Sequence, residues 1–389
     1  MVRQTRRRFL EDTLLAAAAM ATTPAAQVWS AEGASTSANE KLGAAVIGVG
    51  GRGVSHLDAL VSRPDTEVVC IVDCDERTGQ QQADQVSQRQ GRRPGVYRDM
   101  REAFDDPAVD IVSTATPNHW HALVSIWAMQ AGKDVYVEKP VSHNVSEGQR
   151  IVEVARKYHR ICQAGTQCRS MQGTIDAIEF IRSGKIGEVR LARGLCYKRR
   201  PSIGPRGIYE PPKEVSYDLW LGPAPLAPVT RPRFHYDWHW QWAYGNGDLG
   251  NQGAHQIDVA RWALGIDRLS DRVMSYGGRF GYEDAGETAN TQVVLHEFGD
   301  KTLVFEVRGL VTDDYQGARV GVIVYGTDGY VSLSSYAGGV AFDSDGKVRA
   351  CVKITYTIFA KDEVRGCSSS RRERHVALGV VARVPRHSL

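Results

Sequence analysis

Hydrophobic residues in the first half of the chain fall into short continuous runs that alternate with amphipathic stretches. These runs cover residues 44–47, 68–72, 111–115, 135–137 and 160–164. Strands that are apolar throughout are typical of a parallel sheet with helices on both faces. The alternation of strand and helix therefore predicts a doubly wound α/β domain over residues 41–165.

The second half of the chain has a different pattern. Helical spacing predicts helices over 171–183 and 252–264, with a stretch rich in Pro and Trp between them. Longer alternating runs follow at 291–295 and 302–307, separated by Gly and Asp turns. Because alternation is typical of strands with one covered face, residues 166–360 are predicted to form a domain with an antiparallel sheet.

The first residues have the features of an export signal. The segment Thr5-Arg6-Arg7-Arg8-Phe9-Leu10 precedes an Ala-rich apolar stretch, and small residues typical of a cleavage region follow. This order resembles a twin-arginine signal, although Glu11 stands where Lys is common, and a basic amphipathic helix is the alternative. We expect residues 1–30 to direct export to the periplasm, or otherwise out of the cell, through the twin-arginine machinery. Residues 31–40 are expected to be a linker.

Composition limits the classes of partner. The chain has 389 residues, which is enough for two globular domains. Its net charge is +3, so the chain carries no strong excess of either sign. The central chain lacks a Lys/Arg stripe interleaved with aromatic residues, which argues against nucleic acid. No uncharged apolar run reaches the roughly 18 residues of a membrane span. The seven cysteines form no C-x-x-C pair and no zinc spacing, so neither a disulfide framework nor a metal site is expected.

A glycine-rich motif follows the first predicted strand and opens a predicted helix. It reads Gly48-Val49-Gly50-Gly51-Arg52-Gly53, a G-x-G-x-x-G sequence. Gly48 permits a tight turn, Gly50 lets the backbone approach a diphosphate, and Gly53 allows helix and strand to pack closely. The N–H groups at the start of the helix are free to bind the phosphates. The motif therefore predicts a dinucleotide site.

Asp73 closes the second predicted strand, 20 residues after Gly53. A carboxylate in this position accepts hydrogen bonds from the adenosine ribose and repels a 2′-phosphate, which favours NAD. Arg52 and Arg77 lie nearby in the sequence and leave NADP possible.

The triplet Glu138-Lys139-Pro140 follows the apolar run at 135–137, at the edge of the sheet where doubly wound folds bind ligands. Partial desolvation there would lower the pKa of the Lys139 ammonium. Such a lysine can polarise the reacting oxygen or relay its proton. An ordinary strand end is the alternative.

Four segments resemble the Gfo/Idh/MocA family, which includes glucose–fructose oxidoreductase and inositol dehydrogenase. They are AVIGVGGRG at 45–53, TATPNHWH at 114–121, AGKDVYVEKP at 131–140 and GNQGAHQIDVARW at 250–262. The resemblance implies an N-terminal Rossmann domain and a C-terminal α/β domain with a large, mostly antiparallel sheet that often forms the oligomer interface. It also implies an NAD(P)-dependent oxidoreductase that acts on CH–OH groups of sugars and a homo-oligomer.

The resemblance gives roles to single residues. Lys139 matches the family's EKP lysine, and His255 matches the histidine that serves as general base, so both are expected to be catalytic and to bind substrate. Asp258 lies one helical turn after His255 and can orient it or bind a substrate hydroxyl. Asn251 stands where the family often has Asp. An amide can hold a hydroxyl but cannot take its proton, so an Asp–His relay is not expected.

Further cofactor contacts follow from the same resemblance. The segment Thr116-Pro117-Asn118-His119 matches a turn beneath the nicotinamide ribose, so Thr116, Pro117 and Asn118 are candidates. His121 and Glu138 are expected to face the cofactor as well. Gln163 and Arg169 lie near the predicted domain junction. Arg169 is a candidate for substrate binding, and a structural role is open for both.

A cluster of aromatic residues lies just before the His255 helix, over residues 235–244. Sugar rings stack their C–H faces on aromatic side chains, while Asp, His and Gln bind hydroxyls. We therefore expect Tyr236, Trp238 and Trp240 to contact a carbohydrate, either a pyranoside or a cyclic polyol. An aromatic core loop and a strand with one packed face are the alternatives.

Three functions are compatible with these residues. The first is hydride transfer from a ring hydroxyl to NAD, with Lys139 and His255 handling the proton. The second is a redox-neutral glycoside hydrolase or lyase that uses NAD transiently. The third is a non-catalytic binding protein for a sugar or nucleotide, which Asn251 and the basic tail 361–389 favour. The sequence of that tail does not resemble the ending of family members. A frameshift, a truncation or divergence would explain this difference.

Overall fold

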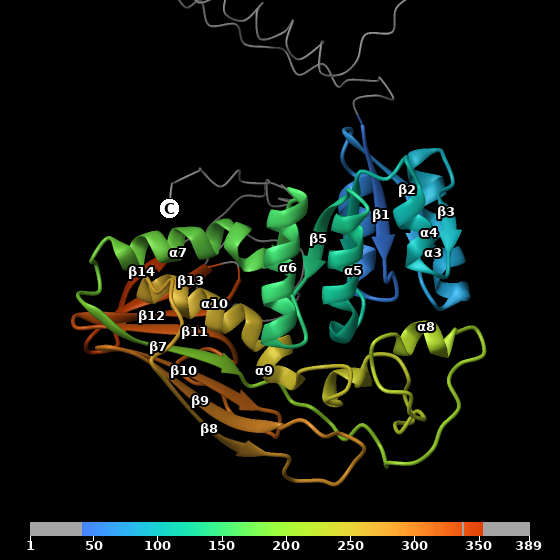
Figure 1. Ribbon diagram of the computed structural model, residues 1–389. Helices are drawn as coiled ribbons and strands as arrows, with labels where there is room; N and C mark the ends of the chain where they lie inside the picture. The colour runs from blue at the N-terminus through green and yellow to red at the C-terminus, as the bar shows by residue number, and fades with distance from the viewer. Residues whose placement is uncertain (1–40, 337, 353–389) are drawn as a thin grey trace, which may run out of the picture. The chain divides into compact units, whose positions relative to one another are not determined.

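A computed structural model describes residues 41–336 and 338–352 (Figure 1). The predicted signal at 1–30, the linker at 31–40 and the basic tail at 361–389 lie outside the described residues, and the predicted domain limits stay predictions. No helix in the described part of the chain combines the length and apolar character that crossing a membrane requires.

The first sheet has six strands, all parallel, in the order β3-β2-β1-β4-β5-β6. The strands are β1 (Leu42–Ile47), β2 (Thr66–Val72), β3 (Gly95–Tyr97), β4 (Ile111–Thr114), β5 (Asp134–Glu138) and β6 (Cys162–Gly165). This order confirms the predicted doubly wound sheet. Its direction of winding reverses between β1 and β4, and such sheets bind ligands beyond the carboxyl ends of the strands at this point.

Helices cover both faces of this sheet. They are α2 (Arg52–Val61), α3 (Glu76–Gln90), α4 (Met100–Asp105), α5 (Asn118–Gln130) and α6 (Val145–Tyr158). Val46 packs into a core with Leu57 of α2 and Ala83 of α3, while its neighbours Ala45 and Ile47 pack into a core on the other face. Both faces of β1 are therefore buried, which explains why the strand is apolar at consecutive positions.

The second sheet has eight strands in the order β14-β13-β12-β11-β7-β10-β9-β8. They are β7 (Val189–Cys196), β8 (Arg272–Gly278), β9 (Thr291–Phe298), β10 (Lys301–Arg308), β11 (Val320–Gly326), β12 (Gly329–Ser335), β13 (Gly338–Asp343) and β14 (Val348–Val352). Only β7 and β10 pair in parallel among these described strands. The large, mostly antiparallel sheet expected from the resemblance is therefore confirmed.

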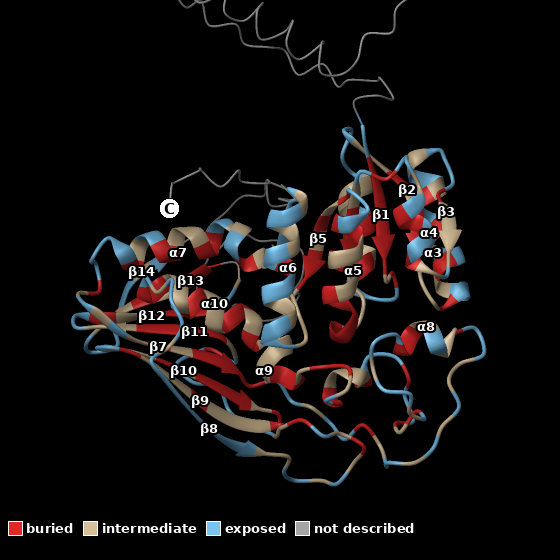
Figure 2. Cartoon of the chain, in the orientation of Figure 1, coloured by how far each residue is buried: buried red, intermediate tan, exposed pale blue. Residues whose placement is uncertain are grey.

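Two helices, α7 (Gln172–Arg182) and α10 (Gly253–Leu264), pack on one face of the second sheet (Figure 1). Their apolar side chains share a core with β7, β10, β11 and β12. The edge strand β8 is exposed over nearly all of its length (Figure 2).

The chain between β7 and α9 (Gly247–Asn251) forms a long connecting segment, residues 198–246, which contains α8 (Tyr217–Leu221) and the 3₁₀ turn η2 (Asp237–Trp240). The connecting segment is held to the first sheet by backbone contacts. Val215 bridges to Asp75, and the N–H of Ser216 donates to the carbonyl of Cys74 at 2.8 Å. The indole of Trp120 donates to the carbonyl of Trp220 at 3.0 Å. Part of the second half of the chain therefore lies at the carboxyl edge of the parallel sheet.

Candidate functional site

A cavity of about 740 Å³ opens at the carboxyl edge of the parallel sheet. Its wall is formed by the turns after β1, β2, β4 and β5, by the connecting segment, and by α9 and α10. The predicted dinucleotide site and the predicted catalytic residues therefore line one continuous space.

In the glycine turn, the fold requires glycine at two positions, and a bound ligand would require it at a third. Gly48 has a φ of +79°, and a Cβ there would lie 2.8 Å from the backbone nitrogen of Thr116. A Cβ on Gly53 would lie 2.0 Å from the carbonyl oxygen of Gly48. A Cβ on Gly50 would meet only Thr78 Cγ2, at 4.0 Å, and would otherwise point into open space. Gly50 therefore keeps the cavity wall free of side chain, as a bound diphosphate requires.

The start of α2 also suits an anion. Its N-cap is Gly51, and no side chain caps the first turn. Helix N-termini of this kind donate their free N–H groups to phosphates. Gly48, Gly50, Gly51 and Arg52 line the cavity. Val49 and Gly53, which were predicted with them, are buried in the packing of β1 against α2 and lie outside the cavity lining.

Asp73 ties the glycine turn to the second strand. Its Oδ2 accepts a hydrogen bond from the N–H of Val49 at 2.8 Å, and its Oδ1 accepts one from the N–H of Asp75 at 2.9 Å. Burial raises the pKa of the Asp73 carboxyl, and the two N–H donors lower it in part. Asp73 lines the cavity.

Asp75 is a second carboxylate at the same edge, and the sequence analysis missed it. Its Oδ1 caps α3 through the N–H of Thr78, at 3.2 Å. Its Oδ2 is buried without a hydrogen bond from any described residue, although His235 Nε2 lies 3.4 Å away. Buried polar atoms without a partner are rare, and a ribose hydroxyl would satisfy this one. The residues at this end of the cavity therefore fit a dinucleotide.

Lys139 connects the two halves of the site. Its ammonium donates to the main-chain oxygen of Asn251 at 2.8 Å and to the side-chain oxygen at 3.0 Å. Burial lowers the pKa of the Lys139 ammonium, and the negative charge of Glu138 offsets this in part.

Glu138 connects the Lys139 turn to the glycine turn. Its carboxylate accepts hydrogen bonds from Arg52 Nε at 2.8 Å and from the N–H of Lys139 at 3.0 Å, and it lies 3.2 Å from His56 Nε2. Burial alone would raise the pKa of Glu138, but the hydrogen bonds from His56 and Arg52 lower it to about 2. A carboxylate anion is therefore fixed beside Lys139. His56 belongs to this arrangement, although no motif pointed to it.

His255 lies in the first turn of α10 and is 5% exposed. Burial, followed by the positive charge of Lys139, lowers the pKa of the His255 imidazole to about 4. The ring is therefore neutral at pH 7 and able to accept a proton. Its Nδ1 lies 3.5 Å from the sulfur of Cys168.

Arg169 and Asp258, which were both predicted to bind substrate, lie outside the cavity lining. The guanidinium of Arg169 donates to both carboxylate oxygens of Asp258, at 2.8 and 2.7 Å. This ion pair satisfies both side chains outside the cavity lining. Both carboxylate oxygens of Asp258 accept from Arg169, and neither is hydrogen-bonded to His255, so the orienting role of Asp258 stays a prediction. Gln163 is exposed and donates to the carbonyl of Ala164, also outside the lining.

The turn after β4 lines the cavity with four residues that were predicted to contact the cofactor, Thr116, Pro117, Asn118 and His121. His121 holds this turn against the Lys139 turn, because its two ring nitrogens lie 2.6 Å from the carbonyl oxygen of Pro140 and 2.8 Å from that of Thr116. Burial lowers the pKa of the His121 imidazole. Asn118 donates to Asn246 Oδ1 at 2.8 Å, which links the same turn to the connecting segment.

The aromatic cluster is divided between the cavity and the core. Tyr236 and Trp238 line the cavity. Trp240 does not, because it is buried beneath the Arg200 guanidinium, 4.7 Å from the ring centre. The alternative of a strand is wrong, since residues 237–240 form the 3₁₀ turn η2. His239 also lines the cavity and was not singled out from the sequence.

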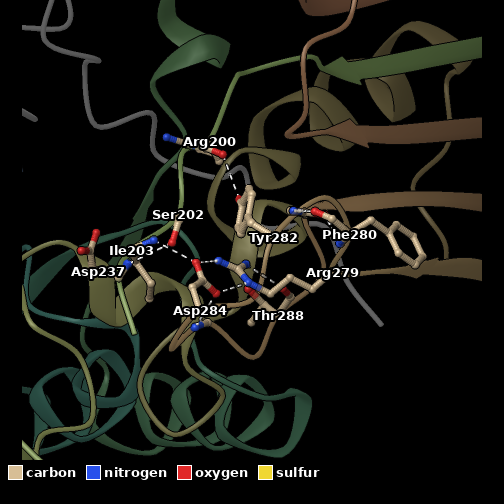
Figure 3. A network of polar contacts seen from close by, with 12 residues as sticks. Arg200, Ser202, Ile203, Asp237, Arg279, Phe280, Tyr282, Asp284 and Thr288 are labelled. Atoms are coloured by element: carbon tan, nitrogen blue, oxygen red, sulfur yellow. Dashed lines mark hydrogen bonds and ion pairs between the residues drawn. The ribbon is translucent and has the colours of Figure 1, made fainter. Parts of the chain in front are cut away.

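A polar network fixes the chain beneath this cluster (Figure 3). Arg200 donates to both oxygens of Asp248, at 2.9 and 2.7 Å, and its own carbonyl accepts from the hydroxyl of Tyr282 at 2.8 Å. Asp284 accepts two hydrogen bonds of 2.6 Å from Arg279 and one of 2.8 Å from the N–H of Ile203 (Figure 3). Buried ion pairs therefore stabilise the aromatic part of the cavity wall.

Two family models match the chain. Residues 42–166 match the model described as "Oxidoreductase family, NAD-binding Rossmann fold", and residues 205–296 match "Oxidoreductase family, C-terminal alpha/beta domain". The chain belongs to the Gfo/Idh/MocA oxidoreductase family. Its parallel sheet is accordingly an NAD-binding Rossmann domain.

Two curated enzymes are similar to part of this chain. An α-N-acetylgalactosaminidase of Shewanella oneidensis is 27% identical over 147 residues, which are 37% of this chain and 32% of that enzyme. A levoglucosan dehydrogenase of Pseudarthrobacter phenanthrenivorans is 28% identical over 178 residues, 46% of this chain and 38% of that enzyme. The matched region thus spans only about a third of the length of these relatives.

Among solved structures of the Gfo/Idh/MocA fold, GenD2 of gentamicin A biosynthesis was determined in complex with NAD. It is 25% identical, with a TM-score of 0.58 over 76% of this chain and 72% of GenD2.

Proposed function

We propose that this chain is an NAD-dependent dehydrogenase of a sugar or cyclic polyol. The observation that carries the proposal is the shared cavity, because the glycine turn, the Lys139 ammonium and the neutral His255 imidazole all line it. The levoglucosan dehydrogenase among the relatives supports a carbohydrate substrate.

His255 and Lys139 have different roles at the reacting hydroxyl. His255 accepts the hydroxyl proton, which its lowered pKa of about 4 allows at neutral pH. The Lys139 ammonium donates a hydrogen bond to the same oxygen and stabilises the negative charge that develops there. Bound NAD supplies the acceptor for the hydride. Asn251 holds Lys139 in place through its two oxygens.

The test is NADH formation by the purified full chain with NAD and a panel of levoglucosan, myo-inositol and methyl glucopyranosides. Lys139→Met and His255→Ala are each expected to reduce kcat/KM by roughly 10²- to 10⁴-fold, as loss of a proton-transfer group does. Asp258→Asn is the matched control, because Asp258 lies outside the cavity lining. Parental turnover by both the Lys139 and the His255 variant would remove the catalytic assignment.

The α-N-acetylgalactosaminidase relative favours a second candidate, a redox-neutral glycoside hydrolase or lyase. Here a ring hydroxyl would be oxidised to a ketone with NAD as hydride acceptor, and the neighbouring carbon would lose a proton as the aglycone leaves. In the hydrolase, water would then add to the double bond, and the hydride would return to the ketone. Such an enzyme releases nitrophenol from p-nitrophenyl glycosides without accumulating NADH, whereas a dehydrogenase accumulates NADH. Analysis of the nucleotide released on denaturation identifies the cofactor carried by the purified protein. Export and homo-oligomer formation stay predictions.

A further inference from the structure

His239 lines the cavity, and one of its two ring nitrogens has no hydrogen-bond partner among the described residues. Its Nδ1 lies against the carbonyl oxygen of Tyr236. A carbonyl oxygen only accepts hydrogen bonds, so in the neutral ring Nδ1 carries the hydrogen and Nε2 carries the lone pair. Burial, followed by the positive charges of Lys139 and Arg200, lowers the pKa of His239 to about 4. The ring therefore keeps this tautomer at neutral pH.

The His239 ring is held rigidly. It stacks on Trp238 with ring centres 3.6 Å apart and an angle of 19° between the planes. The Tyr236 ring packs 4.7 Å away. Tyr236 and the neighbouring Trp240 are themselves held by Arg200, which donates to the Tyr236 hydroxyl at 3.3 Å and stacks on Trp240. Nε2 therefore stays aimed in one direction without a cost in side-chain ordering on binding.

Nε2 of His239 has no hydrogen-bond partner among residues 41–336 and 338–352, whereas Nδ1 is satisfied. The ring lines the same cavity as Lys139, Asn251 and His255. A fixed lone pair in a cavity wall accepts a hydrogen bond from a hydroxyl and repels a carboxylate or phosphate oxygen. This nitrogen is therefore suited to an uncharged polyhydroxylated ligand.

We propose that His239 Nε2 accepts a hydrogen bond from a second substrate hydroxyl, so that the site selects molecules with at least two hydroxyl groups. This inference rests on the proposed dehydrogenase function. His255 takes the proton of the hydroxyl that is oxidised, and His239 binds another hydroxyl that does not react. His239 is then a specificity-determining residue.

Two substitutions separate the two nitrogens of the ring. His239→Asn keeps an amide N–H near Nδ1, able to donate to the Tyr236 carbonyl, but places no acceptor at the Nε2 position. His239→Gln reaches the Nε2 position with an amide oxygen. Because a substrate hydroxyl loses its acceptor in the Asn variant, we expect the KM of this variant to rise roughly 10- to 100-fold, with a smaller change in kcat. The Gln variant is expected to recover part of this loss, and NADH binding is expected to be unchanged in both.

Deoxy analogues of the best substrate identify the hydroxyl. With one monodeoxy analogue, the parent and the Asn variant should have equal KM values, because the hydroxyl that His239 binds is absent. With the other analogues, the difference between the two proteins should persist. Equal losses with every analogue, or no rise of KM in the Asn variant, would overturn the proposal.

A spectroscopic test does not depend on turnover. In the NADH-loaded full chain with ¹⁵N-labelled histidine, the His239 resonances are assigned by their loss in the Asn variant. The Nδ1–H tautomer is expected, and levoglucosan, myo-inositol or methyl glucopyranoside should shift Nε2. An Nε2–H tautomer contradicts the proposal. Turnover of a sugar without a shift of the Nε2 resonance would contradict this inference alone. If the sugars neither bind nor react, both this inference and the proposed function are wrong.

Discussion

The ammonium of Lys139 donates to both oxygens of Asn251, at 2.8 and 3.0 Å. The partner is a neutral amide from α9, so it positions the lysine without adding a negative charge. This matters because burial lowers the pKa of Lys139, and the positive charge of Lys139 in turn helps to hold the pKa of His255 at about 4. We therefore expect the identity of residue 251 to influence the pH range of the site.

Asn251→Asp is expected to shift the acid limb of the pH profile upward. In the parent, kcat/KM should rise as His255 loses its proton near pH 4. A carboxylate beside Lys139 stabilises both cations and should raise this midpoint by roughly one to two pH units. The measurement is kcat/KM from pH 3.5 to 9. Asn144→Asp, the same change at an exposed helix cap, is the control. An unchanged midpoint would show that residue 251 does not govern proton uptake by His255.

Gly50→Val should separate cofactor binding from folding. A Cβ at Gly50 would meet only Thr78 Cγ2, at 4.0 Å, so we expect the variant to keep the parental melting temperature. The branched side chain occupies the space of the diphosphate, so NAD affinity should fall by roughly 100-fold or more. Fluorescence titration with NADH measures this.

Gly53→Ala provides the contrast, because its Cβ would lie 2.0 Å from the Gly48 carbonyl and must disturb the fold itself. We expect a large fall in its melting temperature. Parental NAD affinity in Gly50→Val would contradict the assignment of the diphosphate to this turn.

Glu138→Gln is expected to destabilise the protein in a pH-dependent way. The pKa of Glu138 is about 2, below its usual value of 4.5, so the carboxylate stabilises the fold above about pH 4.5 and loses this effect as pH falls through 2. The shift corresponds to roughly 3 kcal/mol at neutral pH. The difference in unfolding free energy between parent and variant should therefore be largest at pH 7 and narrow between pH 4.5 and 2.

Chemical denaturation at several pH values measures this difference. Glu153→Gln is the surface control, since Glu153 is exposed and, among the described residues, pairs only with Arg150 of its own helix. A difference that is constant over the whole range would mean that the ionisation of Glu138 contributes nothing.

Asp258→Asn should leave catalysis within about threefold of the parent, because Asp258 is engaged by Arg169 outside the cavity lining. Partly exposed ion pairs contribute about 0–1 kcal/mol, so the melting temperature should fall only slightly. Steady-state kinetics and thermal unfolding measure the two effects. A loss of kcat/KM comparable to that of His255→Ala would show that Asp258 takes part in catalysis.

The parallel sheet could be predicted from the sequence because β1, β2, β4 and β5 are apolar at consecutive positions, which few other structures produce. The strand β3 (Gly95–Tyr97) was missed, since three residues are too few to show a period. The glycine turn was predicted with its strand and helix because its conformation is determined locally.

Parts of the site that depend on distant contacts could not be predicted. His56 meets Glu138 across 82 positions, and Asp258 is diverted from His255 by Arg169, 89 positions away. Trp240 resembles its neighbours in sequence, but Arg200 buries it while Tyr236 and Trp238 remain in the cavity wall. Spacing along the chain cannot distinguish such outcomes, because they follow from tertiary packing.

The connecting segment is fixed to the NAD-binding domain at Val215, which bridges to Asp75, and it carries Tyr236 and His239 at the other part of the cavity. One stretch of backbone therefore contacts the walls of both parts of the cavity, and we expect it to couple their occupancy. A bound dinucleotide that orders the connecting segment near Val215 would reduce the conformational entropy that the segment loses when a sugar binds near His239. By thermodynamic reciprocity, each ligand should tighten the binding of its companion by the same factor.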